Sequence, residues 1–458
     1  MDWGFVPLVS FAFGPLLLLS GLACSSENGP RGGAGGSPPI ASGGASSGSG
    51  SFSTSGSYGA SGGPGDAAGR GGDLSNGGAS AGGSGASAGS SGANAGGANA
   101  GSSGASAGSS GASAGSSNET IDTRAMVKAL GFGTNIGNTL ENTATWETGW
   151  GQPLITQAFI NGLAMRGLKT VRVPVAWDTY ANNGTIDPAK MERVKQVVNW
   201  IILAGMYAIV NIHWDGGWID NEKGSAPYTL TNEIKSKFVN YWKQIGTAFS
   251  GVGHQLILEG MNEEGRWTID GQAYGPANIP PLNEMNNLFV TTARAQGGYN
   301  ATRALLIAGF NTDLEKTCVP AFTVPTDPAG AGKLFLSIHY YTPWTFTIKE
   351  MNDSDATQPV STTWGTDAEK KTLEDLFTKL GTCSTEKKIP IILGEFGVAV
   401  GTAPYVRQSA SRIAWMTAVA KACRSRGIVP VLWDTGSEIS RTDGAFSSDF
   451  QQAFNAAK

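Results

Sequence analysis

Two glutamates at the ends of apolar runs are the residues most able to do chemistry together. Glu263 lies near the end of LILEGMNEE (Leu256–Glu264), and Glu395 near the end of PIILGEF (Pro390–Phe396). A short apolar run rich in β-favouring residues is typical of a buried parallel strand, and in α/β folds the reacting groups lie at the carboxyl ends of such strands. We therefore predict that the two carboxyl groups meet, one as general acid and the other as nucleophile.

Strand-like runs and helix-like patterns alternate between residues 119 and 458. The predicted strands are Gly131–Asn138, Thr170–Val175, Tyr207–His213, Leu256–Glu263, Leu305–Gly309, Leu334–Tyr341, Pro390–Phe396 and Val429–Gly436. The predicted helices include Ala189–Leu203, Asn232–Phe249, Asn283–Ala295, Asp367–Leu380 and Val406–Arg426. This alternation predicts an α/β fold, the (β/α)8 TIM barrel. An open doubly wound sheet is the alternative, but no Gly-rich phosphate loop follows an early strand.

Polar side chains stand at the ends of most of these predicted strands. They are Asn138, Arg172, His213, Asn262, Glu263, His339, Tyr341, Glu395, Trp433 and Asp434. One polar residue in such a position is usually a structural group whose hydrogen bonds are satisfied. A set at the same ends of parallel strands is better explained as a functional site.

The first quarter of the chain has a different composition. Residues 25–118 are almost wholly Gly, Ser and Ala with near-copies of GASAGSS, which predicts a disordered linker. Before it, Phe11–Ala23 is apolar but too short to span a bilayer, as in an export signal. Cys24 then follows as in a bacterial lipoprotein, where this cysteine is lipidated. We therefore expect residues 1–24 to direct export and residues 119–458 to form the globular domain, either secreted or lipid-anchored at the cell surface.

The charge and the histidines exclude some partners. The net charge is −4, and no basic run with interleaved aromatic residues occurs, so we expect no nucleic acid partner and favour a neutral substrate. The three histidines are not at metal-ligand spacing, and there is no HExxH motif. His254 precedes a strand and so belongs at the opposite end of the barrel from His213 and His339. We therefore expect no metal site. For the oligomeric state, we expect a monomer.

The motifs, taken in chain order, resemble those of the family-five glycoside hydrolases, endoglucanases and their relatives. They are NIGNTLENTATWETGWGQP, TVRVPVAW, NIHWDGGW, LEGMNEE, IHYYTPW, ILGEFG and LWDTG, and they cover the whole globular region. The resemblance implies hydrolysis of internal β-1,4 bonds in a β-glucan with net retention and no cofactor. Xyloglucan, mixed-linkage glucan, mannan and xylan are alternative substrates. A non-catalytic carbohydrate-binding protein is a remote alternative, because it would be expected to lack one of the glutamates.

The resemblance also implies roles for the residues that match these motifs. Glu263 is the acid/base, preceded by Asn262, and Glu395 is the nucleophile. Arg172 and Tyr341 lie beside Glu395 and lower its pKa, by opposite charge and by a hydrogen bond. His213 and His339 line the sugar-binding cleft near the two glutamates.

Neighbouring acids and aromatic residues complete the predicted site. Strand alternation turns Glu264 away from Glu263 and places Glu259 deeper in the barrel, where it is a partner for Arg172. Indole rings stack on the apolar faces of sugar rings, and the predicted substrate-binding residues are Asn138, Trp214, Trp344 and Trp433. Trp214 stands where the family often has a second histidine.

Three cysteines remain in the predicted globular region. Cys383 precedes the seventh strand and Cys423 lies late in the following helix. Both therefore belong at the end of the barrel opposite the active site, and we predict a disulfide between them. Cys318 follows the fifth strand, on the catalytic side, and is expected to be free.

Overall fold

The computed structural model describes residues 121–220, 229–265, 267, 279–350 and 358–458. The predicted export signal, Cys24 and the Gly/Ser/Ala-rich segment lie outside the described residues. Within the described ranges, no helix has both the length and the apolar character that a membrane crossing requires.

The described chain forms a closed barrel of eight parallel strands, which confirms the predicted fold class. In chain order the barrel strands are β1 (Gly133–Asn135), β2 (Thr170–Val173), β5 (Tyr207–Asn211), β6 (Leu256–Glu259), β7 (Leu305–Ala308), β8 (Leu334–Tyr340), β9 (Ile391–Phe396) and β10 (Val429–Leu432). Each of the eight predicted stretches contains one of them. A two-stranded antiparallel pair, β3 (Ala181–Asn182) and β4 (Thr185–Ile186), lies outside the barrel.

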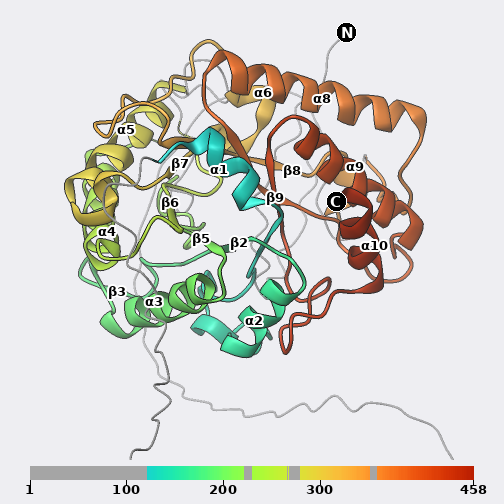
Figure 1. Ribbon diagram of the computed structural model, residues 1–458, viewed down its shortest axis with the longest axis horizontal. Helices are drawn as coiled ribbons and strands as arrows, with labels where there is room; N and C mark the ends of the chain where they lie inside the picture. Colours follow the sequence, from blue (N-terminus) through green and yellow to red (C-terminus); the bar gives the residue numbers. More distant parts are fainter. Residues whose placement is uncertain (1–120, 221–228, 266, 268–278, 351–357) are drawn as a thin grey trace, which may run out of the picture. The chain divides into compact units, whose positions relative to one another are not determined.

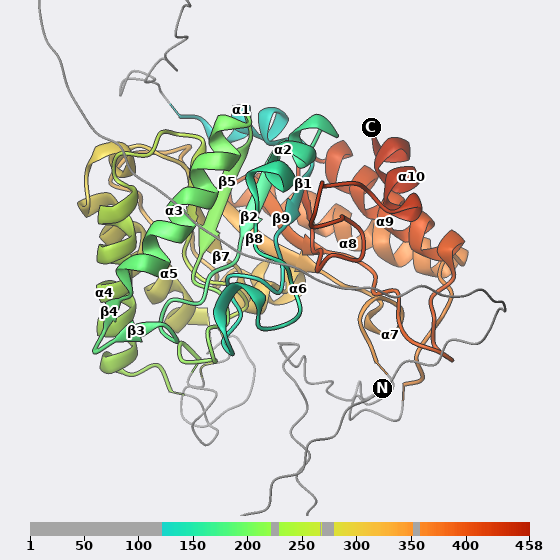
Figure 2. The same cartoon turned by 90° about the horizontal axis from the view of Figure 1, so that it is seen from below.

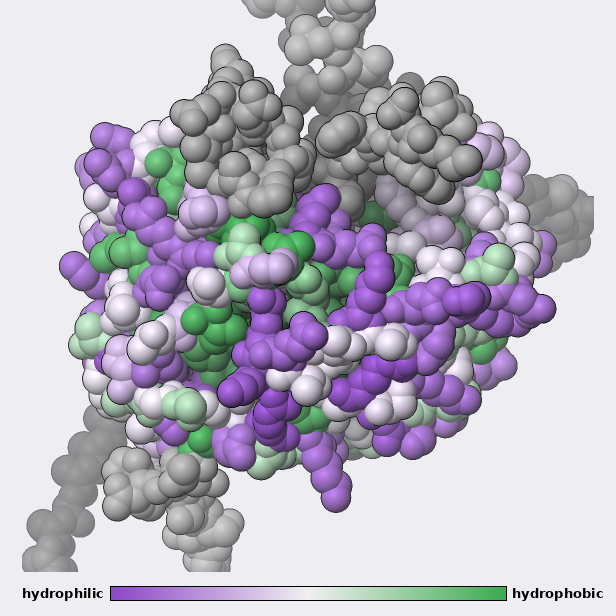
Figure 3. Space-filling model, turned by 90° about the horizontal axis from the view of Figure 1, so that it is seen from above, coloured by the Kyte–Doolittle hydropathy of each residue, from purple (hydrophilic) through white to green (hydrophobic). Residues whose placement is uncertain are grey.

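The larger helices surround the strand ring (Figure 1). They are α2 (Gln157–Met165), α3 (Pro188–Leu203), α4 (Asn232–Phe249), α5 (Ile279–Ala295), α8 (Asp367–Glu386), α9 (Ser409–Ser425) and α10 (Ser448–Ala457). Two short helices, α6 (Leu314–Thr317) and α7 (Trp344–Thr347), follow strands β7 and β8. The side of the molecule where α6 and α8 lie is largely hydrophilic (Figure 3), as expected for helix surfaces in contact with water.

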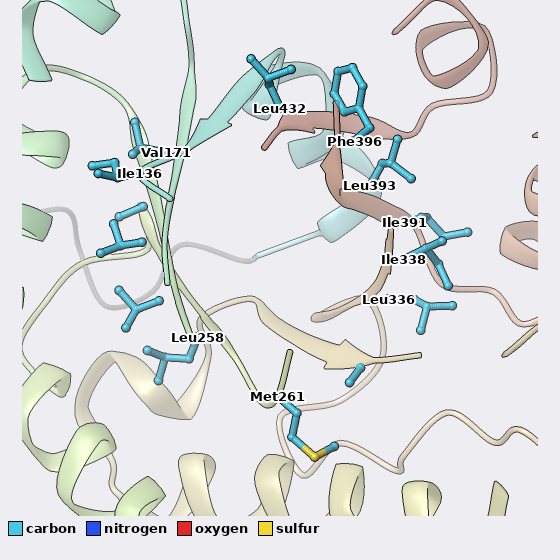
Figure 4. Close-up of a cluster of buried hydrophobic side chains, with 14 of the residues drawn as sticks. Ile136, Val171, Leu258, Met261, Leu336, Ile338, Ile391, Leu393, Phe396 and Leu432 are labelled. Atoms are coloured by element: carbon cyan, nitrogen blue, oxygen red, sulfur yellow. The ribbon is translucent and has the colours of Figure 1, made fainter. Parts of the chain in front are cut away.

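Alternate residues of the strands build two separate cores. Ile391, Leu393 and Phe396 of β9 point away from the barrel centre (Figure 4) and pack in the layer between strands and helices. Ile392, between Ile391 and Leu393, belongs instead to the cluster inside the barrel at its amino-terminal end. All of these side chains are fully buried, so both faces of the strands exclude water. This explains why the strands appear in the sequence as continuous apolar runs.

Helix α1 (Thr123–Leu130) closes the amino-terminal end of the barrel, which we call the floor. Its Met126 and Leu130 pack against the inward-facing residues Ile209, Ile257 and Phe335. Asp122 caps the helix by accepting a hydrogen bond from the backbone N–H of Arg124 at 2.9 Å. Because apolar side chains fill the barrel interior at the floor, we expect the catalytic side chains at the opposite, carboxyl-terminal end.

The predicted disulfide was wrong: Cys383 is joined to Cys318, and Cys423 is free. After β7 the chain runs through α6 to the side of α8, where Lys379 binds Glu315 at 2.8 Å. The Cα atoms of Cys318 and Cys383 are therefore 5.6 Å apart, within the range of a disulfide. Cys423 is fully buried in α9. Chain order placed Cys318 at the end of its strand, but the following segment carries it along the side of the barrel.

Candidate active site

Arg172 organises the carboxyl-terminal half of the barrel interior. Its side chain is fully buried, and its guanidinium donates hydrogen bonds to Glu259 (2.6 Å), Glu395 (2.8 Å), Asn262 (2.8 Å) and Asn135 (2.9 Å). The predicted pairing of Glu259 with Arg172 is confirmed. Because the guanidinium is planar, its contacts fix the relative positions of the ends of strands β1, β6 and β9.

A β-bulge turns Glu395 into the barrel. The register between β8 and β9 runs regularly up to Ile338 and Leu393, and then His339 pairs with Glu395, which leaves Gly394 as an extra residue. Ile392 points inward, so strict alternation would have turned Glu395 outward. A Cβ atom at Gly394 would lie 3.1 Å from both His339 Nε2 and Ser337 Oγ. Glycine at this position therefore avoids a tight contact with both side chains.

The two predicted catalytic glutamates meet across His339. His339 Nδ1 lies 2.7 Å from Glu263 Oε1 and 3.6 Å from Glu395 Oε2. One oxygen of each carboxylate and one ring nitrogen lie within 4.8 Å of one another. Tyr341 donates a hydrogen bond to Glu395 Oε2 at 3.0 Å. The structure thus brings Glu263, Glu395, His339 and Tyr341 together, as predicted.

The pKa of Glu263 suits it to a proton-donating role. Burial raises the pKa of Glu263 to about 7, although the charge of Arg172 and a hydrogen bond from Thr312 act in the opposite direction. A carboxyl group with this pKa still carries its proton in a large fraction of molecules at neutral pH. Glu263 is therefore suited to donate a proton to a leaving group.

Opposing influences act on the carboxyl group of Glu395. Burial raises the pKa of Glu395, whereas the charge of Arg172 and the hydrogen bond from Tyr341 lower it. The predicted direction of these two contributions is confirmed, but burial outweighs them. Burial, together with the charge of Glu395, raises the pKa of Tyr341, so its hydroxyl keeps the proton that it donates.

The two cleft histidines are neutral at physiological pH. Burial lowers the pKa of His339 to about 4 and lowers that of His213 well below its usual value, where Arg172 adds to the effect. A neutral imidazole has one donor and one acceptor nitrogen. His339 Nδ1 can therefore accept a hydrogen bond from protonated Glu263 or, in the other tautomer, donate one to ionised Glu263.

Aromatic side chains border this centre. The indole of Trp433 stacks on the His213 ring, with the ring centroids 5.6 Å apart and the planes 6° from parallel. A Cβ atom at Gly137 would come within 3.0 Å of this indole, so glycine there gives it room. Trp214 and Trp344 are both partly exposed, and the ammonium group of Lys349 lies 4.1 Å from the Trp344 ring centre. These positions leave indole surface available to a ligand.

Asn138 adopts an uncommon backbone conformation at the end of β1. Its φ is 57°, in the left-handed region, and its backbone N–H donates to the carboxylate of Glu141. The backbone N–H of Thr139 donates to the same carboxylate at 2.9 Å. Glu141 thus holds the turn from which the Asn138 side chain projects.

Several residues of the site were not predicted from the sequence. Asn135 accepts from Arg172 and donates to the carbonyl of Gly394 at 2.8 Å, and Ser337 donates to Glu259 at 2.7 Å. Thr312 contacts Glu263 from the loop after β7. Asn135 and Ser337 lie on inward-facing strand positions, and this periodicity is the signal that could have found them. Thr312 has a positive φ of 49°, which the sequence does not reveal.

Glu264 is separated from this network. It is buried, and its pKa is raised well above the usual range by burial and by the charge of Asp220. Its backbone carbonyl accepts a hydrogen bond from Asn311 at 2.8 Å, which joins the ends of β6 and β7. Glu263 rather than Glu264 therefore faces the partner carboxylate.

The same centre has three atoms that could hold a metal ion, one each from Glu263, His339 and Glu395. The guanidinium of Arg172 already neutralises part of the negative charge of Glu395, at 2.8 Å. The arrangement accordingly fits acid–base and nucleophilic chemistry without requiring a cation.

Replacing Glu259 with glutamine is expected to lower the free energy of unfolding by about 3 kcal/mol, since Arg172 would lose its deepest ionic partner within the barrel. Both side chains are fully buried, so water cannot replace the lost charge. Urea unfolding measures the effect. Glu315→Gln is the matched control, because its pair with Lys379 is about 60% exposed and contributes less than about 1 kcal/mol. Equal unfolding midpoints for the two variants would contradict the role given to Arg172.

Comparison with known proteins assigns this geometry to a family. The family model described as Cellulase (glycosyl hydrolase family 5) matches residues 129–438. Endoglucanase A of Paenibacillus barcinonensis is 33% identical over 347 residues, which cover 69% of this chain and 83% of the relative. A xyloglucan-specific endo-β-1,4-glucanase of Bacteroides ovatus is 31% identical over 352 residues, covering 73% of this chain and 67% of the relative.

Solved structures agree with these matches. A broad-specificity endoglucanase from an uncultured bovine rumen ciliate is 31% identical, with a TM-score of 0.64, and the match covers 73% of this chain and 98% of that one. A xyloglucan-specific β-1,4-glucanase from a ruminal metagenomic library, solved with the oligosaccharide XXLG, is 30% identical, with a TM-score of 0.66. That match covers 73% of this chain and 96% of the other.

Proposed function

We propose that this chain, which belongs to the cellulase family of glycosyl hydrolases (family 5), hydrolyses internal β-1,4 bonds of β-glucans. Glu263 and Glu395 would act on the scissile bond in two steps, with Glu263 as acid and then base and Glu395 as nucleophile. The observation that carries this proposal is the close approach of the two carboxylates, which each place an oxygen within 4.8 Å of the other.

In the first step, a carboxylate oxygen of Glu395 bonds to the anomeric carbon while the glycosidic bond breaks. The leaving oxygen takes the proton of Glu263, and a glycosyl ester of Glu395 is left. Arg172 and Tyr341 hold the attacking carboxylate in place through Oε1 and Oε2, respectively. The charge that Glu395 loses passes to Glu263 as the proton leaves.

In the second step, Glu263 takes a proton from water, and the water oxygen bonds to the anomeric carbon as the ester breaks. Esterified Glu395 carries no charge, so a like charge near Glu263 is gone and the pKa of Glu263 falls. The ionised form that acts as base is favoured at this stage. Thr312 and His339 are both placed to donate to it.

This mechanism predicts that the first product has the β-anomeric configuration. Carboxyl groups about 5–5.5 Å apart are typical of retaining enzymes, whereas inverting enzymes need roughly 6.5–9.5 Å to admit a water. Proton NMR during early hydrolysis of a cello-oligosaccharide separates the two anomers before they interconvert. Early appearance of the α-anomer would show inversion and would contradict the two-step mechanism.

The substrate range is proposed to centre on β-glucans, with xyloglucan as the second candidate. The relatives compared above are named as endoglucanases or as xyloglucan-specific enzymes. We expect faster release of reducing ends from carboxymethylcellulose, lichenan and xyloglucan than from mannan and xylan. The Glu395→Ala variant, assayed on each polysaccharide, gives the background rate to be subtracted. Preferential cleavage of mannan or xylan would overturn the assignment to β-glucans.

We also propose that the enzyme is exported and carries a lipid on Cys24. The support is the apolar run Phe11–Ala23, the cysteine directly after it and the long Gly/Ser/Ala-rich segment before the barrel. Incorporation of labelled fatty acid into the expressed full chain, but not into Cys24→Ser, tests it. Label in both proteins, or in neither, would contradict lipidation at Cys24.

A further inference from the structure

A hollow of about 480 Å³ at the barrel floor is lined by five basic residues and no acidic one. The basic residues are Arg124, Lys128, Lys169, Arg424 and Lys458. All five are exposed, and the wall between them is formed by apolar residues and glycines. We call this feature the floor hollow.

The floor hollow lies at the end of the barrel opposite the catalytic glutamates. Phe132, Lys169 and Ile428 each come directly before a strand, β1, β2 and β10 respectively, and these three strands are neighbours. Because all barrel strands are parallel, the amino-terminal ends of these strands share one face. Helix α1 and the chain end after α10 lie at this same face (Figure 2).

No acidic side chain among the described residues forms an ion pair with the cations of the floor hollow. Arg124 and Arg424 donate to the backbone carbonyls of Ser384 and Ala457, and the ammonium of Lys458 lies over the Phe454 ring. Some other cations are paired with acids, as Arg294 is with Asp327, whereas Lys387 donates only to backbone carbonyls among the described residues. Gathering five like charges in one hollow is unfavourable through mutual repulsion, and a bound anion would relieve it. The net charge of −4 makes this local excess more notable.

The walls of the floor hollow limit the kind of anion. Val127 and Phe132 are half-buried and place apolar surface beside the cations, which suits an amphiphile with a charged head and an apolar body. A volume of about 480 Å³ accommodates a small head group rather than a length of polymer. Phosphate oxygens accept hydrogen bonds from both ammonium and guanidinium groups.

We propose that the floor hollow binds the phosphate of an anionic lipid head group and thereby docks the barrel floor on a membrane. Helix α1, which contributes Arg124 and Lys128, begins at Thr123, shortly after the Gly/Ser/Ala-rich segment in the sequence. A docked floor directs the catalytic end away from the membrane and toward polymeric substrate. The orientation comes from the barrel itself, independently of whether Cys24 carries a lipid.

The test is sedimentation of the full chain, carrying Cys24→Ser to exclude an acyl anchor, with vesicles of phosphatidylglycerol in phosphatidylcholine. We expect binding that weakens with added salt, and no binding to pure phosphatidylcholine. The triple variant Lys128→Gln, Lys169→Gln, Lys458→Gln removes three cations whose side chains donate no hydrogen bond to the described residues. It should bind the anionic vesicles on the order of a hundredfold more weakly, from about fivefold per basic residue.

A matched triple variant, Lys243→Gln, Lys370→Gln, Lys371→Gln, removes the same charge from α4 and α8 and should bind as the parent does. Hydrolysis of soluble cello-oligosaccharide should be unchanged in both variants, which separates this proposal from the proposed activity. Equal loss of binding in the two variants would show a general charge effect and overturn the site. Binding of inorganic phosphate without vesicle binding would overturn the membrane as the source of the phosphate.

Discussion

We expect Glu395→Ala to lower kcat on the order of 10⁴-fold to 10⁶-fold. No other single substitution in this chain is expected to lower kcat more. Arg172 and Tyr341 both donate hydrogen bonds to this carboxylate, and without it no covalent intermediate forms. The barrel should stay folded, because Arg172 keeps its buried contact with Glu259. Reducing-end release from carboxymethylcellulose measures the loss.

The control for this prediction must separate lost chemistry from lost binding. The variant should still bind cello-oligosaccharide, which isothermal titration calorimetry measures, because Trp433 and the other indoles are unchanged. Glu386→Ala, an exposed glutamate on α8, should retain parental activity. An active Glu395→Ala enzyme that still releases reducing ends at the parental rate would refute the nucleophile assignment.

Glu263→Gln should lower kcat/KM on natural glucans by roughly 10²-fold to 10⁴-fold, because glutamine cannot give a proton to the leaving oxygen. The parent is active when Glu263 is protonated and Glu395 is ionised. Its kcat/KM should therefore fall as the pH rises through about 7, where Glu263 loses its proton. In Glu263→Gln this alkaline decline should be absent, while the acid decline from protonation of Glu395 remains.

An aryl cellobioside with a good leaving group distinguishes this role from a structural one. Such a leaving group needs little protonation, so the first step should be almost as fast in Glu263→Gln as in the parent, and hydrolysis of the ester should become limiting. A burst of released phenol measures this. If the variant loses activity equally on the aryl substrate and on glucan, or keeps the alkaline decline, Glu263 is not the proton donor.

The barrel and the positions of both glutamates could be predicted because they depend on local sequence. Strands buried on both faces must be apolar throughout, so LILE and IILGEF stand out as runs, and parallel strands bring their carboxyl ends to one face. The pairing of Glu259 with Arg172 followed from the same alternation, since a buried carboxylate needs a cation.

The cysteine pairing could not be predicted, because it depends on the path of the chain after β7. Chain order shows that Cys318 follows the fifth strand and that Cys383 precedes the seventh. Only the course of α6 along the side of α8 brings their Cα atoms to 5.6 Å. Thr312 was missed for a related reason: it reaches Glu263 through the left-handed turn formed with Asn311.

The sequence by itself determined that eight apolar strands carry Glu263 and Glu395 to one end of a barrel. The reason is that apolar runs indicate buried strands, and their alternation with helices indicates that the strands are parallel. The tertiary structure alone decided how the carboxylates face each other. The bulge at Gly394 turns Glu395 inward against the alternation of β9. Arg172, itself held by three further hydrogen bonds, donates to its carboxylate there. Burial then sets the pKa of Glu263 near 7, an outcome that depends on the surrounding packing and on no single motif.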